Sequence, residues 1–227
     1  MLAYREQMGA KLWNSSDNSG QVIVQHTTET ESGNSSVIAY LEETQRGSYQ
    51  TMIDFDGEEV RIVPDDRQAW AAGTTGNAIG LHVCAMGRAA FSRERWLSES
   101  DLIERHAMRY SQWHMLYGIP LVKINATQVR NGVRGVCGHV EISNAFGEVD
   151  HTDPGPNWPY DVVIGRAIEL VNGATPMAWK SVIDGKTYSD DDWKSFVDYH
   201  LWRLDKLNTQ AASHAGLDTS DAALKKL

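Results

Sequence analysis

Short runs of β-branched residues alternate along the chain with longer stretches in which apolar residues recur at helical spacing. A compact run, GQVIVQHT, reaches its end near His26 and indicates a buried strand. The stretch SYQTMIDFDGEEVRIVP predicts a hairpin, with Asp56 and Gly57 in the turn between two alternating runs. A third run, AIGLHVCAM, predicts another strand over residues 78–86.

Helical periodicity is clearest in SESDLIERHAMRYSQWHMLYG, which Gly118 and Pro120 bring to an end. The stretch NSSVIAYLEETQR predicts a second helix, with Ser35 or Ser36 as its N-cap. After Pro159, DVVIGRAIELVN begins with an aspartate cap and predicts a further core helix. Because strands and helices alternate, the pattern predicts an α/β fold with a mixed central sheet flanked by helices.

The two ends of the chain differ from this central region. Residues 1–19 predict a short N-terminal helix followed by a polar linker. From Ser189 onward, SDDDWKSFVDYHLWRLDKL has acids in its first turn and bases near its end, which predicts an amphipathic helix before a polar tail. We therefore expect a main domain over residues 20–172 and a helical C-terminal extension with a polar tail over residues 173–227.

The length, net charge and hydropathy of the chain limit the kinds of partner that we expect it to bind. The chain has 227 residues, enough for one sizeable core with a small appendage. Its formal net charge of −9 argues against nucleic acid as a partner and gives no help in binding anionic lipid. No run approaches the roughly 18 apolar residues that a membrane span needs, so we expect no membrane partner.

The N-terminus and the cysteines bear on the compartment. The first residues, MLAYREQMGAKLW, carry charges where a secretory signal has an apolar core, so we expect synthesis in the cytoplasm without a signal peptide. Cys84 and Cys137 each lie in an apolar stretch and make no disulfide framework. We interpret both as small buried thiols in a protein that folds in a reducing cytosol.

Four of the eight histidines have simple structural interpretations. His106 and His114 fall on or beside the apolar face of the long helix, where packed or capped histidines are commoner than ligands. His200 lies on the C-terminal helical stretch and has the same interpretation. His214 lies in the polar tail.

His26, His139 and His151 differ because they end strands or lie in loops, where a scaffold usually holds its functional groups. Zinc favours imidazole nitrogen and carboxylate oxygen, and a catalytic zinc site uses three protein ligands. The segments VIVQH and GVCGH each end in a histidine, so two adjacent strands would bring His26 and His139 together. The candidates for a third ligand are Glu141, Glu148, Asp150, His151 and Asp153. Composition does not choose among them, and the tight HExxH spacing of many zinc enzymes is absent.

Most of these candidates lie in one unusual stretch, GHVEISNAFGEVDHTDPGPNWPYD, residues 138–161. It combines two histidines, five carboxylates and three prolines with hardly any apolar periodicity. We expect such a stretch to form no local element of its own and to serve as one side of a metal site. The residues alone also admit simpler interpretations: Tyr49 as a strand aromatic, Trp70 and Trp158 as core residues, and Asp153 as a cap before a proline.

Four segments, in order, carry a resemblance to a known family. They are VIVQHTTE, GSYQTMIDFDGEEVRIVP, AWAAGTTGNAIGLHV and GHVEIS…HTDPGPNWPYD. With these segments the chain resembles the zinc-dependent N-acetylmuramoyl-L-alanine amidases of the amidase-2 and peptidoglycan-recognition superfamily. The likeness is greatest to the amidase domains of actinobacterial phage endolysins, it covers roughly residues 20–172, and its last segment is the most specific.

The resemblance implies roles for individual residues. The zinc ligands would be His26, His139 and Asp153, and Zn²⁺ would be the cofactor. Tyr49 falls where phage amidases carry a catalytic tyrosine, and His151 falls where the family usually has a lysine. Both are therefore candidate catalytic residues that stabilise an oxyanion or deliver a proton to the leaving amine. The candidate substrate-binding residues are Trp70, Asn77 and Trp158.

The chain departs from the family pattern at several positions. The loop from His139 to Asp153 spans 153 − 139 = 14 positions, which is longer than usual. His82 stands where cytosolic recycling amidases carry a catalytic glutamate, which puts that role in doubt. Gln50 and Ala71 replace histidines that are common in the family, so we expect an altered groove wall.

We therefore expect a zinc hydrolase that cleaves the amide bond between N-acetylmuramic acid and L-alanine in peptidoglycan. Its partner would be the peptidoglycan substrate, and a wall-binding domain in a longer protein is left open. The enzyme would act on the cell wall after release from a host cell, as a phage endolysin does. The alternatives are a peptidoglycan-binding module without catalysis, a zinc peptidase that cuts within the stem peptide, and a structural protein with a charged loop.

Overall fold

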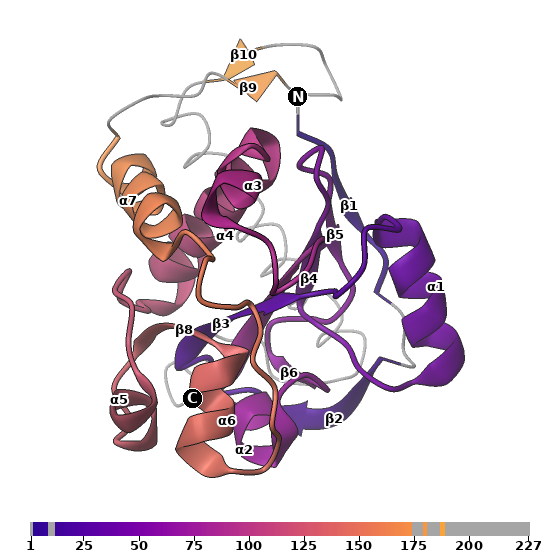
Figure 1. Cartoon of the computed structure of the whole chain (residues 1–227), viewed down its shortest axis with the longest axis vertical. Helices are drawn as coiled ribbons and strands as arrows, with labels where there is room; N and C mark the ends of the chain where they lie inside the picture. The colour runs from indigo at the N-terminus through magenta and orange to yellow at the C-terminus, as the bar shows by residue number, and fades with distance from the viewer. Residues whose placement is uncertain (1, 9–11, 174–178, 181–186, 189–227) are drawn as a thin grey trace, which may run out of the picture. The chain divides into compact units, whose positions relative to one another are not determined.

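A central sheet of six strands organises the region from Leu2 to Ala174 (Figure 1). The computed structural model describes residues 2–8, 12–173, 179–180 and 187–188. In spatial order the strands are β1 (Tyr4–Glu6), β5 (Glu59–Arg61), β4 (Thr51–Ile53), β7 (Gly80–Ala85), β3 (Val22–Thr27) and β8 (Gly135–Gly138). Strands β4, β7, β3 and β8 are parallel to one another, whereas β5 is antiparallel to β4 and parallel to β1. The mixed sheet expected from the sequence is confirmed.

Helices cover both faces of this sheet (Figure 1). On one face lie α3 (Arg93–Leu97), α4 (Ser100–Tyr117) and α7 (Tyr160–Val171). On the other lie α1 (Asn34–Thr44), α2 (Gly73–Ile79), α5 (Ala126–Arg130) and α6 (His139–Phe146). The long helix predicted to end at Gly118 is confirmed as α4, whose last carbonyls are capped by that glycine in a left-handed conformation.

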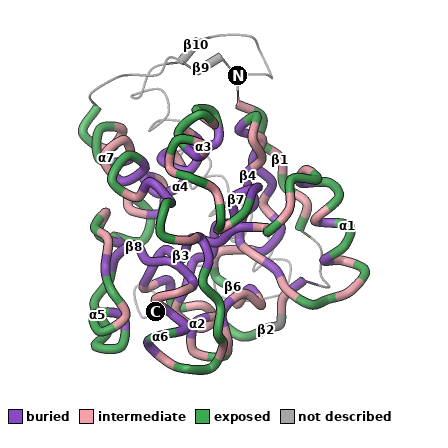
Figure 2. Tube along the Cα trace, viewed as in Figure 1, coloured by how far each residue is buried: buried purple, intermediate pink, exposed green. Residues whose placement is uncertain are grey.

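Alternation along the strands divides the core between the two faces. In β3 and β7, Ile23, Leu81 and Val83 pack against α4 and α7. Val24 packs on the opposite face with α5 and α6, and Cys84 packs there beside α1. Successive side chains point to opposite faces of a strand, so His26 shares a face with Val24. The buried strands stand out against the exposed outer surfaces of the helices in Figure 2.

The predicted hairpin is confirmed, and its turn contains Gly57 at φ 75°. Such a positive φ suits a residue that lacks Cβ. The strand expected over 78–86 is found as β7, which begins only at Gly80. Residues 78 and 79 belong to the end of the helix α2. The cap of α1 is Gly33, one residue before the helix, and neither Ser35 nor Ser36 occupies that position.

The N-terminal helix expected within residues 1–19 is wrong. Residues 4–6 form β1, which pairs with β5, and β2 (Trp13–Asp17) pairs antiparallel with β6 (Arg67–Ala69). The guanidinium group of Arg105 donates a hydrogen bond to the carbonyl of Leu2 at 2.6 Å, and the N–H of Glu59 donates to that of Ala3. Pairing to a sheet edge outweighs the weak helical preference of this segment.

The expectation that residues 138–161 form no local element is also wrong, because α6 occupies His139–Phe146. Ile142 and Ala145, three positions apart, pack into the core beneath the sheet. The N–H of Gly138 donates to the Glu141 carboxylate at 2.6 Å, and Gly147 caps the C-terminus at φ 68°. The sequence signal for this helix was its two terminal caps rather than a long periodic stretch.

In the second unit the structure describes one antiparallel pair, β9 (Trp179–Lys180) and β10 (Thr187–Tyr188). The helix expected from Ser189 and the polar tail lie outside the described residues. Among the described helices, none is both long enough and apolar enough to cross a membrane.

Candidate metal centre

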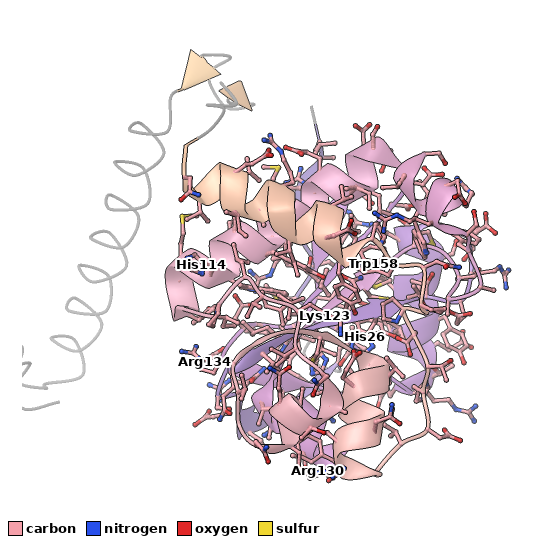
Figure 3. The ribbon with its side chains drawn as sticks, turned by 60° about the vertical axis from the view of Figure 1, so that its left-hand side comes forward. His26, His114, Lys123, Arg130, Arg134 and Trp158 are labelled. Atoms are coloured by element: carbon pink, nitrogen blue, oxygen red, sulfur yellow. The ribbon has the colours of Figure 1, made fainter. Side chains whose placement is uncertain are left out.

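Two adjacent parallel strands place His26 beside His139. His26 lies near the end of β3, and His139 begins α6 directly after β8. Because the carboxyl ends of parallel strands meet at one edge of the sheet, residues that follow them converge there. The imidazole centroids lie 4.6 Å apart. In Figure 3, His26 lies between the layer of α4 and α7 and the helix α6.

The third member of the cluster is Asp153. Its Oδ2 lies 3.1 Å from Nδ1 of His26, and its Oδ1 lies 3.1 Å from Nδ1 of His139. One ligand atom from each of the three residues lies within 4.8 Å of the other two, and all three residues are buried. The residues that the resemblance implied as ligands therefore lie together, and Asp153 is the member of this buried group among the candidates that composition left open.

Backbone groups hold the Asp153 carboxylate in place. The N–H of Thr27, the residue after His26, donates to Oδ2 at 3.3 Å. The carbonyl of Asp153 accepts from the N–H of Val140 at 3.1 Å, in the first turn of α6. This hydrogen bond satisfies one of the free N–H groups of that turn and joins the two ends of the long loop.

The protonation states of this cluster suit a divalent metal. Burial lowers the pKa of His26 to about 4, although the Asp153 carboxylate opposes the shift. Burial alone would raise the pKa of Asp153, but hydrogen bonds with His139 and His26 more than offset it and hold that pKa far below its usual range. At neutral pH the cluster therefore offers a neutral imidazole and a carboxylate, the forms that bind metals.

His151 lies at the exposed side of the cluster. Its ring stacks on His139, with centroids 4.3 Å apart and planes 11° apart. Its Nδ1 lies 3.8 Å from Oδ1 of Asp153, and 59% of its side chain is exposed. His151 thus contacts two of the three candidate ligands while it remains accessible to a substrate.

Tyr49 lies on another side of His26, with the two ring centroids 5.1 Å apart. Burial raises the pKa of the Tyr49 hydroxyl well above its ordinary value, and the nearby Cys84 and Asp153 add to the shift. The hydroxyl therefore carries its proton at neutral pH, so it can donate a hydrogen bond and cannot serve as a base.

A cavity of about 450 Å³ opens beside Tyr49. Its lining is rich in hydroxyl groups and includes one cation: Thr28, Thr30, Ser32, Ser36, Val37, Tyr40, Leu41, Arg46, Gly47 and Tyr49. Tyr40 is 52% exposed and Arg46 is also exposed. This composition suits a polar ligand that carries hydrogen-bonding groups and an anion.

The three candidate substrate-binding residues have different positions. Trp158 lies just before α7 (Figure 3). It is only 3% exposed, and its ring packs against Trp96. The expectation that it contacts substrate is wrong, because a core ring has no face free for a ligand. The Oδ1 atom of Asn77 accepts hydrogen bonds from the N–H groups of Ala71 and Ala72, just before α2. Trp70 is partly exposed, and substrate contacts by Trp70 and Asn77 stay predictions.

His82 has no role that the sequence assigns. This residue is fully buried, and its Nδ1 lies 2.9 Å from Nε2 of His26. Burial lowers the pKa of His82 well below its ordinary value, and the neighbouring His26 adds to the shift. Gln50 is also fully buried and accepts a hydrogen bond from the N–H of His82 at 2.8 Å. Gln50 therefore holds the backbone of His82 in place from within the core. Because it does not line a groove, the expectation that it alters a groove wall is wrong.

The simple interpretations of the other histidines and the cysteines hold within the described residues. His106 is fully buried, and its Nδ1 lies 2.8 Å from the carbonyl of Leu102, one turn earlier in α4. His114 caps the carbonyl of Ile119. Both cysteines are buried free thiols.

Comparisons with solved structures agree with this fold. The Staphylococcus aureus hydrolase AmiA in complex with its ligand is 18% identical, with a TM-score of 0.60 over 74% of this chain and 85% of that chain. A mutant endolysin from Bacillus subtilis is 14% identical, with a TM-score of 0.52 over 74% of this chain and 99% of that one. The N-acetylmuramoyl-L-alanine amidase LysC from Clostridium intestinale URNW is 14% identical, with a TM-score of 0.50 over 73% and 97% of the two chains.

A search among curated proteins gives no significant match. The family model described as N-acetylmuramoyl-L-alanine amidase matches residues 16–156, which include all three members of the buried His-His-Asp cluster. The chain therefore belongs to the Amidase_2 family of N-acetylmuramoyl-L-alanine amidases.

Proposed function

We propose that this chain is a zinc-dependent hydrolase that cleaves the amide bond between N-acetylmuramic acid and L-alanine in peptidoglycan. The observation that carries the proposal is the convergence of His26, His139 and Asp153 within a family that is named for this reaction. Two imidazoles and one carboxylate form a donor set that zinc prefers in catalytic sites, where three protein ligands leave a position for water.

The residues present fit the metal in chemical terms. His26 is neutral, Asp153 is anionic, and the Nδ1 atoms of both histidines face that carboxylate. Zinc bound there would supply a Lewis acid and an activated water at neutral pH. The side chains around the cluster would position the amide and move its protons.

Tyr49 and His151 take separate roles in this proposal. The hydroxyl of the partly buried Tyr49 keeps its proton, so Tyr49 acts as a hydrogen-bond donor to negative charge that develops on the carbonyl oxygen. The exposed imidazole of His151 transfers a proton to the leaving amine, because its accessible ring nitrogens can donate and accept a proton.

The cavity beside Tyr49 is the proposed binding site for the substrate around the scissile amide. Its hydroxyl groups suit the amides and hydroxyls of a muropeptide, and the exposed Arg46 suits a carboxylate of the stem peptide. Trp70 and Asn77 are proposed to extend this contact beyond the cavity.

We further propose that the chain acts as a phage endolysin that reaches the wall after release from an actinobacterial host. In this proposal residues 20–172 form the catalytic domain, and residues 173–227 form a helical extension that contacts the wall. A truncation that removes residues 189–227 tests the second part. Full activity together with full wall binding in the truncated chain would exclude a binding role for the removed segment.

The central experiment is a product analysis. Purified mycobacterial-type peptidoglycan is digested with the metal-free protein, with the same protein after added zinc, and with chelator. We expect new L-alanine amino termini that require zinc, with no new reducing sugar ends. New amino termini on another residue would instead establish a stem-peptide peptidase. Wall binding without any cleavage would establish a recognition module.

A further inference from the structure

His82 lies directly behind one of the candidate metal ligands. In the parallel pair of β3 and β7, Val24 is the partner of His82 and His26 is the partner of Cys84. The two histidines therefore project from the same face of the sheet, one pair of residues apart. Their rings are 5.1 Å apart between centroids, and the contact between Nε2 of His26 and Nδ1 of His82 is 2.9 Å.

This contact has two proton arrangements with different consequences for His26. If Nδ1 of His82 carries the proton, Nε2 of His26 must accept it, and the proton of a neutral His26 lies on Nδ1 facing Asp153. That arrangement blocks the nitrogen nearest the carboxylate. If Nε2 of His26 carries the proton instead, it donates to His82, and Nδ1 of His26 has a free lone pair directed at the cluster.

We propose that His82 is a positioning residue whose Nδ1 accepts the Nε2 proton of His26, so that His26 presents its Nδ1 to the metal beside His139 and Asp153. A histidine that binds a metal usually donates its other ring proton to a nearby acceptor, which fixes both its tautomer and its orientation. His82 is the acceptor within reach of His26 on that side. The inference rests on the proposed zinc site.

The surroundings of His82 hold its ring for this contact. Gln50 fixes the His82 backbone through the 2.8 Å hydrogen bond to its N–H. A Cβ on Gly80 would lie 2.7 Å from both Cε1 and Nε2 of the His82 ring, so the ring lies directly against the bare backbone of that glycine. The carbonyl oxygen of Gly76 lies 2.8 Å from the same point and so borders the far edge of the ring.

The surroundings of Nε2 at the far edge of the His82 ring are consistent with the proposed proton positions. Nε2 of His82 is buried without a hydrogen-bond partner among the described residues, and the Gly76 carbonyl borders that edge of the ring. When Nδ1 of His82 accepts from His26, its own proton lies on Nε2 and points toward that carbonyl. Nε2 of His139 likewise has no hydrogen-bond partner among the described residues, so no comparable acceptor contact orients that ring.

The test compares His82→Asn with His82→Phe. The amide oxygen of asparagine can take the place of Nδ1 and accept the His26 proton, whereas phenylalanine fills the space without an acceptor. Zinc dissociation constants are measured on the metal-free proteins by competition with a chromophoric chelator. We expect His82→Phe to weaken zinc binding by about 10- to 100-fold and His82→Asn to stay within about threefold of the unchanged chain.

The matched control is His106→Phe, which changes another fully buried histidine that does not contact the three ligands. It should leave the zinc dissociation constant unchanged. A second readout is the proton NMR resonance of the His26 Nε2–H in the zinc-loaded protein, which should be protected from exchange and should lose that protection in His82→Phe. If His82→Phe does not fold, Gly80→Ala displaces the His82 ring instead and should also weaken zinc binding.

Equal zinc affinity in the unchanged chain and His82→Phe would overturn the inference. So would equal weakening in His82→Asn and His82→Phe, because that result would show a loss of packing rather than of an acceptor. Failure of the proposed function has a different signature, namely absence of zinc binding in the unchanged chain.

Discussion

The carboxylate of Asp153 lies 3.1 Å from the imidazole of His26, although 127 positions separate the two residues in the chain. The contact joins a central strand to the end of a loop that the fold returns to the same edge of the sheet. The N–H of Thr27 reaches the same carboxylate oxygen, so the pair is held by backbone as well as by side chains. Because the carboxylate is buried and held in place, we expect its substitution to weaken metal binding and to lower activity.

Asp153→Asn should weaken zinc binding by more than about 100-fold, because even changes to the outer partners of metal ligands cost about 10- to 100-fold. Peptidoglycan cleavage should fall in parallel. The control is Asp150→Asn, which removes an exposed acid from the same loop and should leave zinc affinity unchanged. Zinc content after dialysis and release of alanine amino termini measure the two effects. Full zinc content in Asp153→Asn would show that Asp153 is not a ligand.

The sequence could predict much of the site because short segments with specific residue types carry it. The ends of VIVQH and GVCGH predicted that two adjacent strands would bring His26 and His139 together, and the sheet confirms it. The third ligand could not be chosen from composition, since several acids and a histidine share the loop. Only the family resemblance separated Asp153 from them, and the structure places it against both histidines.

The predictions that proved wrong concern residues whose positions are set by tertiary contacts rather than by the local sequence pattern. Trp158 lies within the most specific segment of the chain, yet it packs against Trp96 and lies in the core. Residues 4–6 pair with a sheet edge that no local pattern reveals. The contact of His82 with His26 depends on the register between β3 and β7, which period-two alternation alone does not specify.

Tyr49→Phe should lower kcat by about 100- to 1,000-fold if its hydroxyl donates to the developing oxyanion, since removal of one such donor costs about that much. Zinc affinity should be unchanged, because Tyr49 does not belong to the ligand cluster. Tyr4→Phe is the matched control, as it removes a hydroxyl from an exposed tyrosine that does not line this cavity. An unchanged kcat in Tyr49→Phe would show that the Tyr49 hydroxyl takes no part in catalysis and that the residue only lines the cavity.

Glu59→Gln should lower the free energy of unfolding by about 3–5 kcal/mol, because it leaves a buried cation without its partner. Nε of Arg109 donates to the Glu59 carboxylate at 2.6 Å, and the two side chains are 4% and 2% exposed. Glu58→Gln breaks the partly exposed pair with Arg5 and should cost no more than about 1 kcal/mol. Denaturant unfolding of the metal-free proteins compares the two. Equal effects would show that burial does not govern the Glu59 pair.

His106 should make the unfolding free energy depend on pH. Burial lowers its pKa in the folded protein from the ordinary 6.5 to about 4. Above 6.5 neither the folded nor the unfolded chain protonates this imidazole, so its contribution to stability is fully present there. Between 6.5 and 4 the unfolded chain binds the proton first, so that contribution is lost as the pH falls, by up to about 1.4 kcal/mol per pH unit.

His106→Phe removes this titration while it keeps an aromatic ring beside Trp158, whose centroid lies 5.0 Å from that of His106. The variant should therefore lose stability less steeply than the unchanged chain as the pH falls from 6.5 to 4, and the two curves should run parallel at higher pH. Unfolding is followed in denaturant with chelator present, so that metal release from the His26 cluster does not enter the comparison. Curves of unfolding free energy against pH that stay parallel across the whole range would contradict this prediction. They would mean that His106 is protonated as readily in the folded protein as in the unfolded chain, so that burial does not control its charge.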